Sequence, residues 1–327
     1  MSTLTKRNSE NLTPNVTAPD DVEHKASNET NEALQRYHEM MAAWGEGRFN
    51  APDTADAAVA DFFTQDVTFD METANGHVAD VPEFKVYAFE TIKQWFDFLA
   101  KFDISDIVVS AVPNSQDPSE IWQRFSCQTA SKETGKSMLT EGLFIFNFEG
   151  KKIKRLTGIY ADPDRFAWIN SKNNDMPAQL TLPSFEPHPD PKPVFETIFA
   201  AWGSGEFAAE ETKQAAMDKF NRSDIVMDVS SSLLPDVFKV YHGTAGVDAW
   251  ANGVIGQWEF TRFDSTTETG LKPGCVMQKL DVDVKHKGTG KEAQGIRIYN
   301  ELAYDVDGKG VYTKHFWANP AVAASLY

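Results

Sequence analysis

Cysteine is scarce in this chain: Cys127 and Cys275 are the only two among 327 residues. Two cysteines exclude the disulfide framework of many small secreted proteins, so we predict two free, buried thiols. The seven histidines are scattered, with no pair at ligand spacing and no cysteine companion. A glycine-rich phosphate loop is missing as well. The sequence therefore predicts neither a metal site nor a cofactor.

Long apolar runs are also missing from the sequence. No stretch of about 18 consecutive apolar residues occurs, so no membrane-spanning helix is predicted. The first residues lack the apolar segment of a secretory signal, which makes the cytoplasm the expected location.

Positive charge is in deficit. Lys and Arg total 31 against 48 Asp and Glu, a formal net charge of −17. Affinity for nucleic acids and for anionic membranes comes largely from Lys and Arg, so we expect neither partner. The hydrophobic fraction of 41% and the 23 Phe residues instead fit packed globular domains.

An internal repeat organises the chain. Residues 41–49 (MAAWGEGRF) return as residues 199–207 (FAAWGSGEF), an offset of 202 − 44 = 158. Residues 66–70 (DVTFD) return as residues 224–228 (DIVMD) at the same offset. Solenoid repeats have periods of about 20–50 residues, so this spacing indicates a duplicated globular domain.

Composition sets the expected boundaries. Residues 1–32 are polar and predict a disordered tail, because they cannot bury enough apolar surface to offset chain entropy. Residues 169–191 are polar and proline-studded, which is typical of a stiff linker. The two repeated domains are then residues 33–168 and 192–327.

Each copy has helical patterns followed by strand-like patterns. In the first copy, apolar residues spaced by three and four predict helices near 33–44, 57–63 and 89–102. Strands are expected at 67–71, 104–112, 121–130, 137–148 and 152–160, with a glycine turn at 148–151 joining the last two. In the second copy we expect helices at 193–202, 212–220 and 246–258, and strands at 225–229, 276–285, 293–306 and 310–318. This order is typical of an α+β domain.

The repeated Trp-Gly-x-Gly-x-Phe helix end and the Asp-x-x-x-Asp strand entry resemble SnoaL-like members of the nuclear transport factor 2-like superfamily. The resemblance implies two tandem cone-shaped domains, each with three helices packed on a curved mixed or antiparallel sheet around a pocket. In the family the outer sheet face commonly packs against a partner subunit. We therefore expect an intramolecular pseudo-dimer, sheet against sheet, and leave a further homo-oligomer open.

Ketosteroid isomerases of this superfamily use a tyrosine, an aspartate base and a second acid. A glycine-anchored alignment gives these roles no acid or base here, because only Asn300 can even form a hydrogen bond. The positions are Met40 and Ile198, Met71 and Val229, and Gly142 and Asn300.

The second copy keeps more polar groups on its expected inner face, so we place the candidate site there. Candidate catalytic residues are His315, Asn300, Asp228 and His242, each with an alternative structural role such as stabilising a turn or strand end. The direction of His315 is left open, since two alignments place it on opposite sheet faces. Candidate substrate-binding residues, which would form an apolar wall with one cation, are Tyr241, Trp250, Ile298, Leu302, Tyr304 and Lys314.

Two functions remain for such a site. The first is a cofactor-independent isomerase, cyclase, dehydratase or lyase acting on a hydrophobic small molecule in the second domain. The alternative is a non-catalytic ligand-binding or scaffold protein assembled through its sheet faces.

Overall fold

The computed structural model describes residues 31–71, 82–207, 209, 211–231 and 233–327. The predicted disordered tail at 1–32 therefore lies almost wholly outside the described residues.

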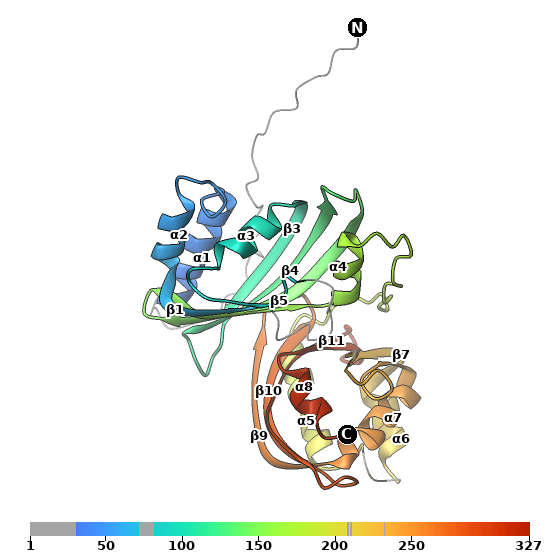
Figure 1. The fold of residues 1–327 in the computed structure, drawn as a ribbon. Helices are drawn as coiled ribbons and strands as arrows, with labels where there is room; N and C mark the ends of the chain where they lie inside the picture. Colours follow the sequence, from blue (N-terminus) through green and yellow to red (C-terminus); the bar gives the residue numbers. More distant parts are fainter. Residues whose placement is uncertain (1–30, 72–81, 208, 210, 232) are drawn as a thin grey trace.

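The first half of the chain forms one six-stranded mixed sheet with helices at its concave face and ends (Figure 1). The strand order is β2-β1-β6-β5-β4-β3, and only β1 and β6 run parallel. Its elements are α1 (Glu32–Gly45), α2 (Ala55–Phe62), β1 (Phe63–Asp70), β2 (Val86–Tyr87), α3 (Lys93–Leu99), β3 (Phe102–Pro113), β4 (Glu120–Ser131), β5 (Ser137–Glu149), β6 (Lys152–Tyr160) and α4 (Pro163–Asn170).

The second half repeats this topology in the strand order β8-β7-β12-β11-β10-β9. The predicted tandem α+β fold is thereby confirmed. Its elements are α5 (Pro191–Gly203), α6 (Lys213–Phe220), β7 (Asn221–Asp228), β8 (Val240–His242), α7 (Gly243–Gly253), the short 3-10 helix η1 (Ile255–Gln257), β9 (Trp258–Thr269), β10 (Cys275–His286), β11 (Glu292–Tyr304), β12 (Gly310–Trp317) and α8 (Pro320–Ala324).

Strand β9 was not predicted from the sequence. It lies at the sheet edge, and most of its side chains are exposed or half-buried, so its polar sequence carries no clear alternation of buried and exposed positions. The predicted helix at 246–258 was accordingly too long: α7 ends at Gly253 and β9 begins at Trp258.

Helix α1 shows how individual residues determine where a helix begins and ends and which face it buries. The side chain of Asn31 caps its N-terminus by accepting a hydrogen bond from the Leu34 amide at 2.9 Å. Gly47, just beyond the helix, takes φ +74°, a conformation that favours glycine. The buried side chains recur at helical spacing and face the sheet: Ala33, Tyr37, Met40 and Ala43.

A β-bulge bends the second sheet. The register between β10 and β11 shifts between Val282 and Val284, opposite Gly295, whose φ is +69°. The Gly295 amide donates to the Asp283 carboxylate at 2.6 Å, which satisfies the group that the ladder leaves unpaired. Bulges increase local twist, so this one helps the sheet curve around its concave face.

The two sheets pack against each other through their outer faces. The ring of Trp122 meets that of Tyr299 edge-on at 5.5 Å, inside a buried apolar cluster formed by both halves. At one side of this cluster the Lys279 ammonium contacts the Glu120 carboxylate at 2.9 Å. A pseudo-dimer that persists in solution stays a prediction.

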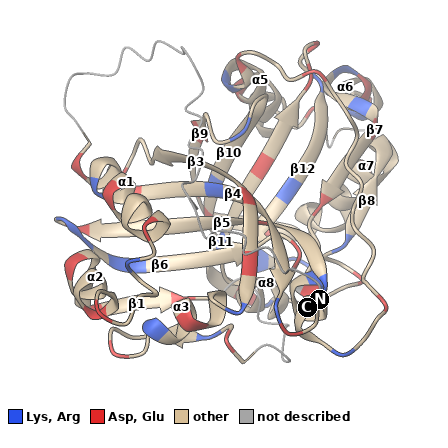
Figure 2. Cartoon of the chain, turned by 90° about the horizontal axis from the view of Figure 1, so that it is seen from above, with Lys and Arg blue, Asp and Glu red and all other residues tan. Residues whose placement is uncertain are grey.

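Both cysteines are free and buried, as predicted. Among the described residues, none of the helices combines the length and apolar character needed to cross a membrane. Acidic and basic residues alternate along both halves of the chain, with neither kind confined to one half (Figure 2).

Candidate functional site

The concave side of the second sheet encloses a cavity of about 530 Å³. Its walls come from α5, α7, η1 and strands β7 and β9–β12. None of the described residues that line it is charged. Most of its lining is aromatic or aliphatic, including Phe195, Phe199, Trp202, Met227, Val247, Trp250, Trp258, Leu280, Val282, Ile298 and Leu302.

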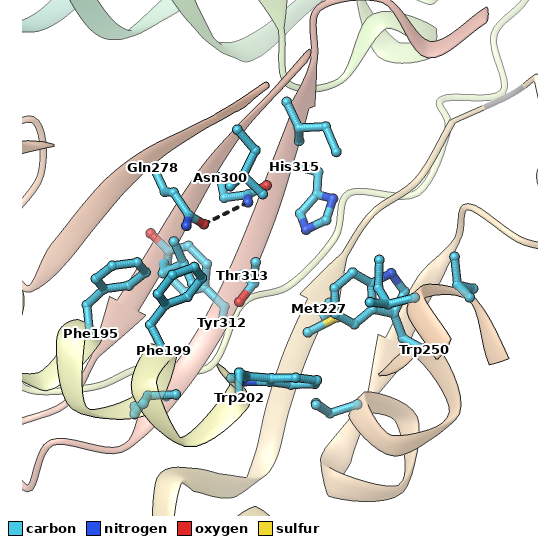
Figure 3. Close-up of a pocket in the computed structure, with 18 of the residues that line it drawn as sticks. Phe195, Phe199, Trp202, Met227, Trp250, Gln278, Asn300, Tyr312, Thr313 and His315 are labelled. Carbon is cyan, nitrogen blue, oxygen red and sulfur yellow. Dashed lines mark hydrogen bonds between the residues drawn. The ribbon is translucent and has the colours of Figure 1, made fainter. Parts of the chain in front are cut away.

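Two neighbouring strands supply an ordered pair of amides. Gln278 on β10 lies opposite Asn300 on β11, and the Asn300 side-chain nitrogen donates to the Gln278 oxygen at 3.1 Å (Figure 3). The Gln278 nitrogen in turn donates to the Ser265 hydroxyl at 3.0 Å. This chain of bonds leaves the Asn300 Oδ1 buried without a described partner. A buried acceptor of this kind is satisfied by a donor on a ligand or by water.

His315 lies beside Asn300 in the β11–β12 ladder and packs against the Trp250 ring at 5.7 Å. Its Nδ1 is also buried without a described partner. Burial lowers the pKa of His315 to about 4, against the opposing effect of the Asp228 charge. The imidazole is therefore neutral at pH 7 and offers one donor and one acceptor.

Six of the ten residues predicted from sequence line this cavity. Figure 3 shows Asn300 and His315 projecting toward the space beside the Trp202 ring. Of the two directions left open for His315, the structure has the inward one. The six residues are His315, Asn300, Trp250, Ile298, Leu302 and Tyr304.

Asp228 and Lys314 are not in the cavity, which corrects their placement. Strand side chains alternate between faces, so Met227 and His315 point inward while Asp228 and Lys314 reach the outer face. There the Lys314 ammonium lies 3.6 Å from the Asp228 carboxylate, in a cleft of about 390 Å³ between the two domains.

Tyr241 and His242 also lie outside the cavity lining. The Tyr241 hydroxyl donates to the Val237 carbonyl at 2.8 Å, which occupies it structurally. His242 is exposed at the start of α7 and makes no capping hydrogen bond with its side chain. Tyr241 pairs with Met227 and packs against the inner apolar cluster without reaching the cavity, whereas His242 pairs with Val226 on the opposite face.

Sequence reasoning missed Gln278, Thr313 and most of the aromatic residues that line the cavity. Trp202 was used only as a marker of the repeat, although its ring lines the cavity. Gln278 has a counterpart in the first sheet, since Gln123 lies opposite Phe144 as Gln278 lies opposite Asn300, but only the strand pairing shows that the two are equivalent.

The first domain has no comparable cavity among its described residues. Phe144 takes the place of Asn300, and Gly158, its neighbour on β6, takes the place of His315. The glycine-anchored alignment of Gly142 with Asn300 was therefore wrong by two residues. Phe144 stacks on Phe125 at 4.8 Å, and the remaining voids measure about 40 and 50 Å³. The concave face of the first domain is thus filled by its own side chains.

No group of three or more His, Cys, Asp or Glu in the described part of the chain is arranged to hold a metal ion.

Comparison with known proteins extends to the fold alone. No family model matches the chain, and no curated protein matches it. Among solved structures it is similar to a candidate isomerase from Bacillus subtilis, with 14% identity, a TM-score of 0.35, and coverage of 44% of this chain and 98% of the other. A nuclear transport factor 2-like protein from Burkholderia xenovorans LB400 matches with 13% identity, a TM-score of 0.32 and coverage of 44% and 98%. A candidate SnoaL-like polyketide cyclase from Mesorhizobium loti matches with 12% identity, a TM-score of 0.30 and coverage of 39% and 97%. The chain is thus similar to nuclear transport factor 2-like and SnoaL-like proteins, as its repeated motifs implied.

Proposed function

We propose that the second domain binds a largely apolar small molecule and converts it by cofactor-independent chemistry of the isomerase, cyclase, dehydratase or lyase type. One observation carries this proposal: an apolar cavity of about 530 Å³ contains two buried polar atoms without described partners, Asn300 Oδ1 and His315 Nδ1. Pockets of roughly 300–1,000 Å³ with few placed polar groups are typical of small-molecule sites.

The cavity favours an apolar body for physical reasons. Each 100 Å² of apolar ligand surface removed from water stabilises the complex by about 2.5 kcal/mol. A charged body would lose its hydration without a counter-ion, because the described lining carries no charge.

The two unpartnered atoms select the polar group of the ligand. Asn300 Oδ1 can only accept a hydrogen bond, so it calls for a hydroxyl or N–H donor. An unpaired buried polar atom costs about 1–3 kcal/mol, which penalises a ligand that leaves Asn300 or His315 unsatisfied.

In the catalytic proposal His315 carries the proton. A neutral imidazole accepts a proton from the ligand, and then returns it at another atom in an isomerisation or passes it to the departing leaving group in an elimination. The Asn300–Gln278 amide pair supplies fixed dipoles in a dry cavity, where they act strongly on developing charge.

Ligand binding without turnover is the second candidate. It is favoured by the low pKa of His315, about 4, because burial makes this imidazole a weak base near neutral pH. It is favoured too by the lack of any carboxylate among the described lining residues.

A ligand screen with matched variants tests both candidates. Apolar ligands that raise the melting temperature of the wild type are identified first, and their conversion is then followed by mass spectrometry. We expect His315→Gln to keep binding within a few-fold and to lose conversion by about 100-fold or more. The control His242→Gln, outside the cavity, should leave both unchanged.

The outcomes of this screen distinguish the two candidate functions and test the assigned cavity. Ligands that bind but are not converted by the wild type favour the storage or scaffold candidate. If no apolar ligand binds the wild type, or if Asn300→Phe leaves ligand binding intact, the cavity is not the ligand-binding site.

A further inference from the structure

A row of polar side chains crosses the concave face of the second sheet. Directly paired positions on the four strands β9 to β12 hold this row, which consists of Thr267, Gln278, Asn300 and His315. Ser265 lies two residues from Thr267 on β9 and therefore on the same face of the strand. The edge strand and the centre of the cavity are thus connected by polar groups.

Three of these side chains form a hydrogen-bond relay that runs in one direction. The Asn300 nitrogen donates to the Gln278 oxygen at 3.1 Å, and the Gln278 nitrogen donates to the Ser265 hydroxyl at 3.0 Å (Figure 3). The hydroxyl hydrogen of Ser265 has no acceptor among the described residues. The relay therefore begins at the unpartnered Asn300 Oδ1 and ends at a hydroxyl whose hydrogen is not used.

The relay can also run in the opposite direction with the same number of hydrogen bonds. A half-turn of each terminal amide exchanges its oxygen and nitrogen without changing its shape. Ser265 then donates to the Gln278 oxygen, Gln278 donates to Asn300 Oδ1, and the Asn300 nitrogen faces the cavity. Ser265 permits both directions because a hydroxyl donates and accepts. No described lining residue is charged, so no ion in the cavity wall favours one direction.

His315 has a similar freedom at the end of the row. Its Nδ1 is buried without a described partner, and burial lowers the pKa of the ring to about 4. A neutral imidazole carries its hydrogen on either nitrogen, so Nδ1 can donate or accept. Paired positions of an antiparallel ladder have Cβ atoms about 4.5–5.5 Å apart, which brings Asn300 and His315 within reach of one ligand oxygen.

The first domain lacks this relay at the equivalent positions. There Gln123 accepts a hydrogen bond from the Tyr37 hydroxyl of α1 at 2.9 Å. Tyr37 corresponds to Phe195 of α5, an offset of 195 − 37 = 158, so the second domain has no such hydroxyl. The other two positions of the relay hold apolar residues, Val109 and Phe144. Among the described residues, the relay is thus confined to the domain with the large cavity.

We propose that Ser265 and Gln278 are positioning residues that let Asn300 present either its oxygen or its nitrogen to the ligand. The cavity then accepts both a hydroxyl and a carbonyl on the same apolar skeleton. This inference rests on the proposed function and extends its ligand class, because the described direction of the relay alone calls for a hydrogen-bond donor.

Two probes that differ only at one oxygen test the relay. The affinities of cyclododecanol and cyclododecanone are measured by displacement of N-phenyl-1-naphthylamine fluorescence from the full chain. We expect the wild type to bind the two within about threefold of each other, because one direction of the relay suits each probe. Ser265→Asp should bind cyclododecanone about tenfold more weakly and keep its affinity for cyclododecanol.

This preference follows from the carboxylate that Ser265→Asp introduces, which can only accept. It holds the Gln278 nitrogen, so the Gln278 oxygen holds the Asn300 nitrogen and Oδ1 faces the ligand. A ketone brings no hydrogen to that oxygen, whereas an alcohol does. Gln278→Glu imposes the same direction and, in alkaline buffer that keeps its carboxylate ionised, should show the same preference. It provides the test if Ser265→Asp does not fold.

Two controls separate the relay from a structural effect. Ser265→Thr keeps a hydroxyl and should retain the wild-type ratio of affinities. Thr261→Asp adds the same charge at an exposed position of β9 outside the cavity lining, and it should retain this ratio as well. An unchanged ratio in the folded Ser265→Asp or Gln278→Glu variant would overturn the relay, as would a tenfold preference for the alcohol in the wild type. The proposed function stands in both cases, since the probes bind. If neither probe binds the wild type, the proposed function fails together with the relay.

Discussion

The Arg124 guanidinium of the first domain donates from Nε to Oε2 of Glu301 in the second domain at 2.8 Å, with both side chains buried. The same arginine also contacts Glu141 at 2.8 Å, and Tyr312 donates to Glu301 at 2.6 Å. Burial alone would raise the pKa of Glu301. The positive charges of Arg124 and Lys272 have the larger, opposite effect and lower this pKa to about 2. Glu301 follows Asn300 on β11, so the interface network and the cavity share one strand.

Removing Arg124 should therefore be costly. Arg124→Met leaves Glu301 buried without its main counter-charge, and we expect a loss of about 3–5 kcal/mol in the free energy of unfolding, measured with urea. The double variant with Glu301→Leu should recover part of this loss, because the orphaned charge is gone. Arg222→Met, at an exposed pair, should cost about 1 kcal/mol or less. A loss of similar size in Arg124→Met and Arg222→Met would contradict this account.

Substitutions at the equivalent positions 144 and 300 should change the free volume of the two domains in opposite directions. Asn300→Phe introduces the aromatic ring found at Phe144 in the first domain, so we expect it to fill the second cavity and reduce binding of N-phenyl-1-naphthylamine by at least tenfold. Phe144→Ala should open the first domain and cost about 3 kcal/mol of stability. Both effects are measured by fluorescence titration and urea unfolding; unchanged probe binding in Asn300→Phe would argue against the assigned cavity.

Gly158 should resist substitution. A Cβ there would lie 2.4 Å from the Met71 methyl carbon and 2.6 Å from the Phe144 ring. We expect Gly158→Ala to destabilise the protein by about 1–3 kcal/mol through overpacking. Gly203→Ala is the control, because its Cβ would meet nothing within 4 Å. Equal melting temperatures for these two variants would show that the first core is looser than described.

His315 should make stability depend on pH in a defined window. Its pKa falls from 6.5 to about 4 on burial, so between these values the unfolded chain binds more protons than the folded one. The free energy of unfolding should then decrease as pH falls from 6.5 to 4, by about 3 kcal/mol. The contribution of His315 is isolated by measuring the free energy of unfolding in urea for the wild type and for His315→Phe at each pH. Identical pH profiles for the two proteins would mean that His315 titrates normally.

The duplication and the class of fold could be predicted from sequence, because they depend on features local in the chain. The motif at 44–49 and 202–207 ends a helix in both copies, and apolar spacing marks most of the strands. The exposed edge strand β9 has no such pattern, so only backbone pairing with β10 reveals it.

Only part of the candidate site could be predicted from the sequence. His315 and Asn300 were singled out for their chemistry, but their direction depends on strand register, and a shift of one residue exchanges the two faces of a strand. The same alternation placed Lys314 and Asp228 in the interdomain cleft instead of the cavity.

By itself, the sequence determined that two related α+β domains follow one another. It also indicated that the second domain keeps more polar groups than the first on the inner face of its sheet. Only the tertiary structure decided which domain is open. Phe144 and Met71 fill the first concave face, whereas Asn300 and His315 border an empty one. The reason is physical: cavity volume depends on how side chains from distant strands and helices meet in space, and no local pattern in the chain records that.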